Sequence, residues 1–245
     1  DRFEFNRPYS CIDIRFGESS EILAQLTWDT RTILWLDYDK QLTKDKLSDI
    51  SLFCSSALSG SILAVSVNVH PDKYDSKDRN ARLKQLIGRV GENKVPGNTK
   101  ASELNHWGLA AVCHRIIINE IHETLSRRNG GLHQDEKFIF LPLFGFCYED
   151  GAKMLTSGGL IYKQKDYSLV EKCNFADLPY LISDDKSTYY IRVPILTFRE
   201  IRYLDGYLPS NGEIEDLEIP DWLPEDFAKQ YAQVYRYFPA FAETE

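Results

Sequence analysis

Cysteine is scarce in this sequence, and its few copies are scattered. The 245 residues include five cysteines, and no two of them form a CxxC pair. Without such pairs we expect neither a zinc knuckle nor a disulfide framework. Free thiols are the common state of cysteine in a reducing compartment, so this pattern favours a cytoplasmic protein.

Long apolar runs are also absent, and so is an excess of basic charge. No segment has the length of a membrane span or the pattern of a signal peptide. Lys and Arg number 29 against 37 Asp and Glu, which gives a formal net charge of −8. That balance argues against broad, non-specific binding to nucleic-acid phosphates. We therefore expect a protein with no membrane segment and no general affinity for nucleic acids.

The remaining composition is that of an ordinary globular protein. Hydrophobic residues make up 43% of the chain, aromatic residues 13% and charged residues 27%. A chain of this length can form one large domain, or a domain with an appendage. We predict strands at 10–16, 32–36 and 62–69, helices at 19–26, 43–56 and 102–126, and a β-hairpin of strands 137–148 and 153–162. This order predicts parallel crossovers, with the hairpin as an antiparallel addition to the sheet.

Polar residues follow two of the predicted strands. The run at 32–36 is continuously apolar, which predicts a central, fully buried strand, and Asp37 and Asp39 come directly after it. Asn68 lies at the end of the next strand, and His70 follows it. Ligands of open α/β sheets bind beyond the carboxyl ends of the strands. These side chains are therefore candidates for a binding site, and His70 is a candidate base by its position.

The run from Ile12 to Val69 resembles the middle of the class I S-adenosylmethionine-dependent methyltransferases, and it is most similar to the O-methyltransferase type. The motifs that carry the resemblance are Gly17-Glu18-Ser19, then Asp37-Tyr38-Asp39-Lys40, then Gly60 and Val67-Asn68. The resemblance implies an α/β fold with a Rossmann-like sheet, mostly parallel with an antiparallel edge hairpin. It implies a methyltransferase-like domain at residues 1–165 and a mixed C-terminal extension packed on it at residues 166–245.

The glycine-rich cofactor loop of this family has no counterpart in the chain, because no G-x-G-x-x-G motif occurs anywhere. In the family that loop follows the first strand, and a ribose-binding acid ends the second strand. The resemblance therefore implies that this chain begins partway through the fold, after about two strands and their helices.

The resemblance implies S-adenosylmethionine as the cofactor and suggests roles for particular side chains. The residues placed at the cofactor are Gly17, Glu18, Ser19, Asp37 and Tyr38. Asp39 and Asn68 would contact the substrate. Asp37 would also orient or deprotonate the methyl acceptor, with His70 as the second catalytic candidate. Structural explanations stay open: Glu18 or Asp37 can serve a helix start, and Tyr38 can pack in the core.

Metal binding is not predicted. Metal-dependent members of the resembling group hold a divalent ion with an Asp after the fourth strand and an Asp-Asn pair after the fifth. The corresponding pair here is Val67-Asn68, so one ligand is missing. In the predicted helix 102–126, His114 is not three or four residues from another histidine, so no metal pair forms on one helix face. We interpret His114 as a core residue.

Three functions stay open at this point. The first is a methyltransferase acting on a small-molecule or protein acceptor. The second is an inactive methyltransferase-fold subunit that binds or scaffolds partners in a bacterial multi-protein assembly. Its contact surface would be the acidic segment 213–226 and the aromatic cluster at 231–241. The third is a nicotinamide-dependent enzyme, which the antiparallel hairpin disfavours because the dinucleotide fold continues with a parallel strand.

Overall fold

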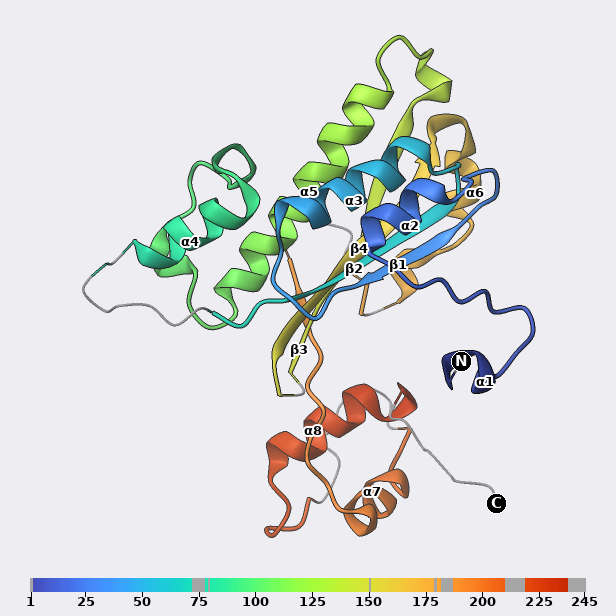
Figure 1. Cartoon of the computed structure of the whole chain (residues 1–245). Coiled ribbons are helices and arrows are strands. Elements are labelled where there is room, and N and C mark those ends of the chain that lie inside the picture. The colour runs from blue at the N-terminus through green and yellow to red at the C-terminus, as the bar shows by residue number, and fades with distance from the viewer. Residues whose placement is uncertain are drawn as a thin grey trace. The chain divides into compact units, whose positions relative to one another are not determined.

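The chain divides into two compact units, Asp1–Tyr189 and Tyr190–Glu245. The computed structural model, drawn in Figure 1, describes residues 2–71, 78, 80–149, 151–178, 180–181, 187–209 and 219–237. Residues 166–189 belong to the first unit. The division into a methyltransferase-like domain at residues 1–165 and a C-terminal extension at residues 166–245 stays a prediction.

A five-stranded sheet forms the centre of the first unit. Its strands are β1 (Ile33–Asp37), β2 (Ser61–Asn68), β3 (Phe138–Glu149), β4 (Lys153–Lys163) and β5 (Tyr189–Tyr190), in the spatial order β1-β2-β4-β3-β5. β1 pairs with β2 in parallel, whereas β4 pairs antiparallel with both β2 and β3. The mixed α/β class is confirmed, and so is the antiparallel hairpin beside a parallel pair.

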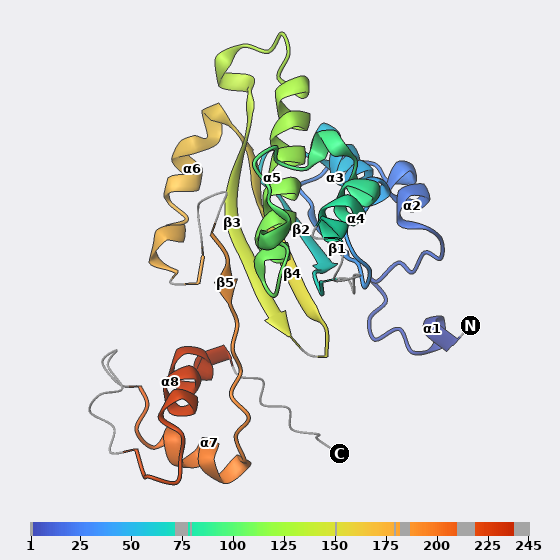
Figure 2. The same ribbon diagram turned by 90° about the vertical axis from the view of Figure 1, so that its left-hand side faces the viewer.

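Helices cover the sheet on both faces. The helices of the first unit are α1 (Arg2–Phe5), α2 (Ser19–Gln25), α3 (Lys44–Ser56), α4 (Ala81–Val90), α5 (Gly108–Arg128) and α6 (Tyr167–Glu171). Figure 2 shows α2, α3 and α5 on one side of the sheet and α6 on the other. The order β1-α3-β2 gives the crossover that the alternation of apolar segments predicts.

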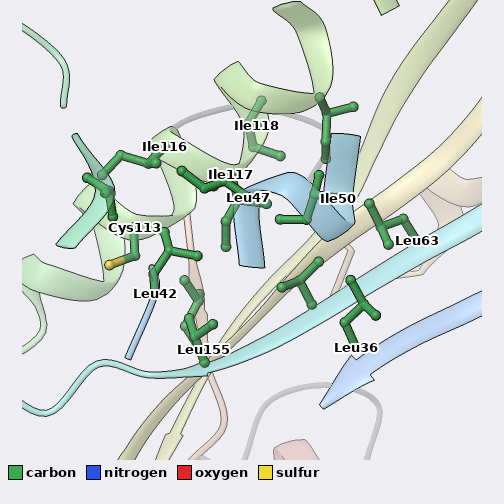
Figure 3. Close-up of a cluster of buried hydrophobic side chains, with 14 of the residues drawn as sticks. Leu36, Leu42, Leu47, Ile50, Leu63, Cys113, Ile116, Ile117, Ile118 and Leu155 are labelled. Carbon is green, nitrogen blue, oxygen red and sulfur yellow. The ribbon is translucent and has the colours of Figure 1, made fainter. Parts of the chain in front are cut away.

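The main core lies between α3, α5 and the sheet. Side chains from these elements point into one space in Figure 3, and Ile50, Leu63 and Ile117 are each 0% exposed. Full burial of an aliphatic side chain of this size contributes about 1.5–3 kcal/mol. The core therefore fixes the carboxyl ends of β1 and β2, where five of the eight predicted site residues lie.

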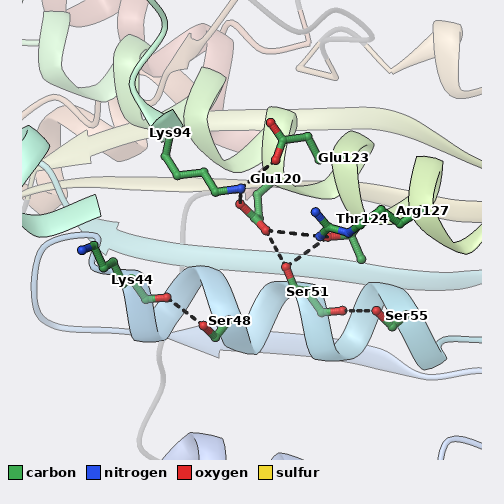
Figure 4. Close-up of polar contacts among 9 residues, drawn as sticks. All are labelled: Lys44, Ser48, Ser51, Ser55, Lys94, Glu120, Glu123, Thr124 and Arg127. Carbon is green, nitrogen blue, oxygen red and sulfur yellow. Dashed lines mark hydrogen bonds and ion pairs between the residues drawn. The ribbon is translucent and has the colours of Figure 1, made fainter. Parts of the chain in front are cut away.

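Polar contacts add to the packing of α3 against α5. The Glu120 carboxylate is buried; it accepts a hydrogen bond from Ser51 Oγ at 2.5 Å and pairs with Lys94 Nζ at 2.6 Å (Figure 4). Lys94 Nζ also lies 2.6 Å from Glu123, whose side chain is half exposed. The buried carboxylate thus has both an ion-pair partner and a hydrogen-bond donor, and these contacts offset the cost of its burial.

Two predictions about the first strands are wrong. Residues 12–16 form no strand; Asp13 and Arg15 pair with each other at 2.8 Å, and Phe16 is 65% exposed. β1 is an edge strand of the described sheet rather than a central buried one, with Ile33 at 75% and Trp35 at 63% exposure. An apolar run has the same local pattern at an edge and at the centre, because burial depends on which elements pack against it.

The second unit has a small core of its own. Its helices are α7 (Phe198–Asp205) and α8 (Glu225–Val234), and Leu204, Leu223, Ala228 and Tyr231 are buried between them. Thr197 is the N-cap residue of α7 and forms a capping box with Glu200. None of the helices in the described part of the chain is both long and apolar enough to cross a membrane.

Candidate functional site

A cavity of about 590 Å³ lies at the carboxyl ends of the two parallel strands. Its lining residues are Asp39, Lys40, Gln41, Thr43, Asn68, His70, Pro71 and Arg89. The first four follow β1 and reach the start of α3, the next three end or follow β2, and Arg89 comes from α4. This is the position at which open α/β sheets bind ligands.

The two loops that form the cavity are tied to each other. The Asn68 side-chain oxygen accepts a hydrogen bond from the backbone N–H of His70 at 2.8 Å. The Gln41 amide donates to the carbonyl oxygen of His70 at 3.0 Å, and the backbone N–H of Asn68 donates to the Lys40 carbonyl at 3.2 Å. These bonds hold the backbone of His70 from both sides, while its imidazole is left exposed at the cavity.

Charges of both signs line the cavity. Asp39 supplies a carboxylate, Lys40 and Arg89 supply cations, and His70 supplies an imidazole. Thr43, Gln41 and Asn68 add neutral hydrogen-bonding groups. Such a lining suits a small polar ligand that carries more than one kind of charge, because each group finds a complementary partner.

The Lys46 side chain binds the backbone of the loop after β1. Its ammonium donates to the carbonyl oxygens of Lys40 at 2.7 Å and Gln41 at 2.5 Å, and it lies 4.9 Å from the centre of the Tyr38 ring. Burial, together with the nearby Lys40 charge, lowers the pKa of Lys46 to about 8. The protonated form is therefore less favourable here than in water, although it makes both carbonyl contacts.

A buried carboxylate joins two of the predicted cofactor-contacting segments. Asp49 on α3 is 3% exposed, and its Oδ2 accepts hydrogen bonds from Ser19 Oγ and from the Tyr38 hydroxyl, each at 2.6 Å. Burial, and then the bond to Asp49, raises the pKa of the Tyr38 phenol well above its ordinary value. Asp49 thus ties the start of α2 to the residue that follows β1.

The predicted site residues fall into three groups. Asp39, Asn68 and His70 come together in the cavity. Ser19 and Tyr38 meet at Asp49. Gly17, Glu18 and Asp37 are exposed and belong to neither group.

The exposed group has structural features of its own. Gly17 has a φ of +155°, where an added Cβ would lie 3.3 Å from Ile22. Glu18 is the N-cap residue of α2 but makes no side-chain capping bond. Asp37 does not cap the following helix, because Thr43 is the N-cap residue of α3.

Sequence reasoning missed Asp49, Lys46, Gln41 and Arg89. Gln41 directly follows a recognised motif, so the motif could have been extended to include it. Asp49 had a weaker signal: it lies next to Ile50 and four residues before Phe53, on the buried side of α3. A single acid on that side is normally read as a surface residue, since its partners come from other segments.

The part of the chain that the structure describes contains no group of three or more His, Cys, Asp and Glu that could hold a metal ion. The five cysteines are free thiols. His114 is buried in the core on α5, with Nδ1 2.8 Å from Ser157 Oγ on β4, as the sequence interpretation has it.

The entire chain matches one known family. Residues 1–245 match the family described as "Putative O-methyltransferase". No curated protein matches the chain. The fold agrees with this assignment, because a methyltransferase-like sheet places its ligand cavity where the loops after β1 and β2 meet. The chain therefore belongs to this O-methyltransferase family.

Proposed function

We propose that this protein transfers a methyl group from S-adenosylmethionine to an oxygen acceptor, in the cavity at the ends of β1 and β2. The observation that carries the proposal is the convergence of Asp39, Asn68 and His70 in that cavity. Membership of an O-methyltransferase family supports the type of reaction. The free thiols suit a reducing compartment, and we place the reaction in the cytoplasm.

The residues present fit the chemistry of the cofactor. S-adenosylmethionine carries a sulfonium, an ammonium, a carboxylate and ribose hydroxyls, and when bound it supplies an electrophilic methyl group. Lys40 can pair with the carboxylate. Thr43 adds a further hydrogen-bonding group. We propose that Gly17, Glu18, Ser19 and Tyr38 complete the cofactor side of the site.

The chain's own residues would position the acceptor and take its proton. We assign Asn68 and Asp39 to binding of the acceptor and His70 to removal of the proton from its hydroxyl. Asp37, exposed at the end of β1, would orient the acceptor or share the role of base. Rate enhancement then comes mainly from holding the acceptor oxygen close to the methyl group.

Calorimetric titration of S-adenosylmethionine and S-adenosylhomocysteine into the full chain tests the cofactor. We expect one binding site, and an affinity about tenfold weaker in Lys40→Ala, as for loss of a charged hydrogen bond. The control is Asp13→Asn, on the exposed segment that precedes α2. No binding of either compound to the wild-type protein would overturn the proposal.

Transfer of a labelled methyl group to a panel of phenols and hydroxy acids tests the base. His70→Ala should abolish transfer and leave cofactor binding unchanged, because the imidazole acts on the acceptor. His133→Ala is the control, since this histidine side chain is 83% exposed and lies outside the cavity lining. Equal loss of transfer in both variants would remove His70 from its role.

The second candidate function is that of a subunit that binds a protein partner and catalyses no reaction. It is favoured by exposed apolar side chains in the second unit: Ile195 at 89%, Phe198 at 70% and Trp222 at 62%. The acidic run at 213–218 and residues 238–241 lie outside the described residues. Sedimentation of the full chain, wild type against Trp222→Ser with Phe198→Ser, tests this candidate. A monomer in both cases would rule out assembly of the chain with itself through these side chains, and methyl transfer by the wild-type protein would rule out an inactive subunit.

A further inference from the structure

A second cavity lies on the face of the sheet that α6 covers, away from the cavity at the ends of β1 and β2. Its volume is about 340 Å³, within the lower range of small-molecule pockets. The wall on the sheet side comes from Leu141 and Leu143 of β3 and Tyr162 of β4. Figure 2 shows α6 on this side of the sheet, opposite α3 and α5.

Aromatic rings form much of the lining. Tyr162 is 6% exposed and packs with Leu143, and Phe175 packs against the same cluster from the turn after α6. Tyr167, at the start of α6, is 47% exposed and brings a third ring to the cavity. Ring faces carry partial negative charge, so a cavity lined by several rings attracts a cation more than an anion.

Two carboxylates add charge of the same sign. Glu171 on α6 and Asp177 in the turn after it both line the cavity. The described lining holds no lysine, arginine or histidine. Lys163 and Lys165, which lie close in sequence, each pair with Glu136 at 2.6 Å. The cavity is thus apolar where β3 and β4 line it, and it carries negative charge on the side of α6 and the turn after α6.

We propose that this second cavity binds a small organic cation, an alkylammonium group with a short apolar body. The apolar body would contact Leu141 and Leu143, and the ammonium group would lie among the rings and the two carboxylates. An anionic ligand would meet two carboxylates and no cationic side chain among the described lining residues, and a neutral one would form no ion pair with Glu171 or Asp177. This site is independent of the methyl-transfer proposal and would stand if that proposal failed.

Titration of tetramethylammonium chloride into the full chain, followed by NMR, tests the site. Tert-butanol serves as the neutral probe of similar size and shape. We expect tetramethylammonium to bind at millimolar concentration and to shift the signals of Tyr167 and Phe175. Tert-butanol should bind at least about tenfold more weakly, the loss typical of a desolvated cation–ring contact with nearby carboxylates.

Substitutions at the rim identify the groups responsible. Glu171 and Tyr167 are exposed, so we expect the fold to tolerate Glu171→Gln and Tyr167→Leu. Each substitution should weaken tetramethylammonium binding several-fold. The control is Glu92→Gln, an exposed carboxylate next to α4 that should leave binding unchanged. Equal affinity for the two probes would overturn the proposal. Absence of binding, or equal weakening by the control, would overturn it as well.

Discussion

At the scale of single residues, Asp49 links more of the candidate site than any residue of the recognised motifs. Its one oxygen atom Oδ2 holds both Ser19 and Tyr38, and the carboxylate is almost completely buried. A buried carboxylate needs hydrogen-bond donors, and these two hydroxyls supply them to Oδ2. The segments before α2 and after β1 therefore depend on one side chain of α3.

Replacing Asp49 tests this dependence. Asp49→Ala should lower the free energy of unfolding by about 1–3 kcal/mol, since it leaves two half-buried hydroxyls without their acceptor. The pKa of Tyr38 should fall toward its ordinary value, because the negative charge beside the phenol is gone. NMR titration of the Tyr38 signal, assigned with Tyr38→Phe, measures this shift. Asp45→Asn, on the exposed side of α3, is the control; an unchanged Tyr38 titration in Asp49→Ala would contradict the assignment.

Lys46 makes the stability depend on pH. Its pKa is about 8 in the folded protein against an ordinary value of 10.5, so the unfolded chain holds more protons between these two values. The contribution of Lys46 to the free energy of unfolding should therefore rise with pH across that window and be constant below it. Urea denaturation at several pH values gives the free energy of unfolding of the wild type and of Lys46→Gln. The wild-type value minus the Lys46→Gln value isolates the contribution of Lys46. A difference that falls with pH from 8 to 10.5 would show the opposite sign and refute it.

At the scale of secondary-structure elements, the contact between α3 and α5 decides how the β1–α3 connection is held. The apolar part of that contact is reinforced by Glu120, which joins Ser51 of α3 to Lys94. Glu123 binds the same Lys94 Nζ at the same distance, but its side chain is 49% exposed against 5% for Glu120. The two ion pairs differ mainly in burial, so they form a matched comparison.

Substitution of the two glutamates should separate a buried ion pair from an exposed one. Glu120→Ala should cost about 3–5 kcal/mol, because it removes one partner of a buried ion pair. Glu123→Ala should cost less than about 1 kcal/mol. Urea denaturation of both variants measures the difference. If both variants lost the same free energy of unfolding, burial of Glu120 would not strengthen its ion pair with Lys94.

At the scale of the whole molecule, the chain has separate hydrophobic cores. The main core belongs to the first unit, and the cluster around Leu204, Leu223 and Tyr231 belongs to the second. Tyr231 donates a hydrogen bond to Asp205 at 2.7 Å, which joins α8 to α7 within the second unit. Units with their own cores can unfold in separate transitions, so a single unfolding free energy would not describe both.

Core substitutions should act on one unit at a time. Leu223→Ala should lower the melting temperature of the second unit only, with a cost of about 2–5 kcal/mol for a buried leucine. Ile117→Ala, in the main core, should shift only the transition of the first unit. Scanning calorimetry of the full chain resolves the two transitions. If either substitution moved both transitions equally, the two cores would be unfolding as one unit.

Much of the candidate site could be predicted because it is local in the sequence. Asp39, Asn68 and His70 each follow a strand that its apolar run reveals, and parallel strands bring their carboxyl ends to one edge. The helices α2 and α3 were predictable for the same reason. Asp49 and Arg89 were not, since each reaches the site from a helix whose own pattern says nothing about its distant partners.

The amino-acid sequence by itself determined the α/β class, the alternation of β1, α3 and β2, the antiparallel hairpin and the polar residues at the strand ends. These follow from periodicity and turn residues, which act over a few neighbouring positions. Tertiary structure alone decided that β1 is an edge strand, that residues 12–16 stay outside the sheet, and that Asp49 joins Ser19 to Tyr38. Burial and hydrogen-bond partners at these positions come from segments far away in the chain, and no local pattern encodes them.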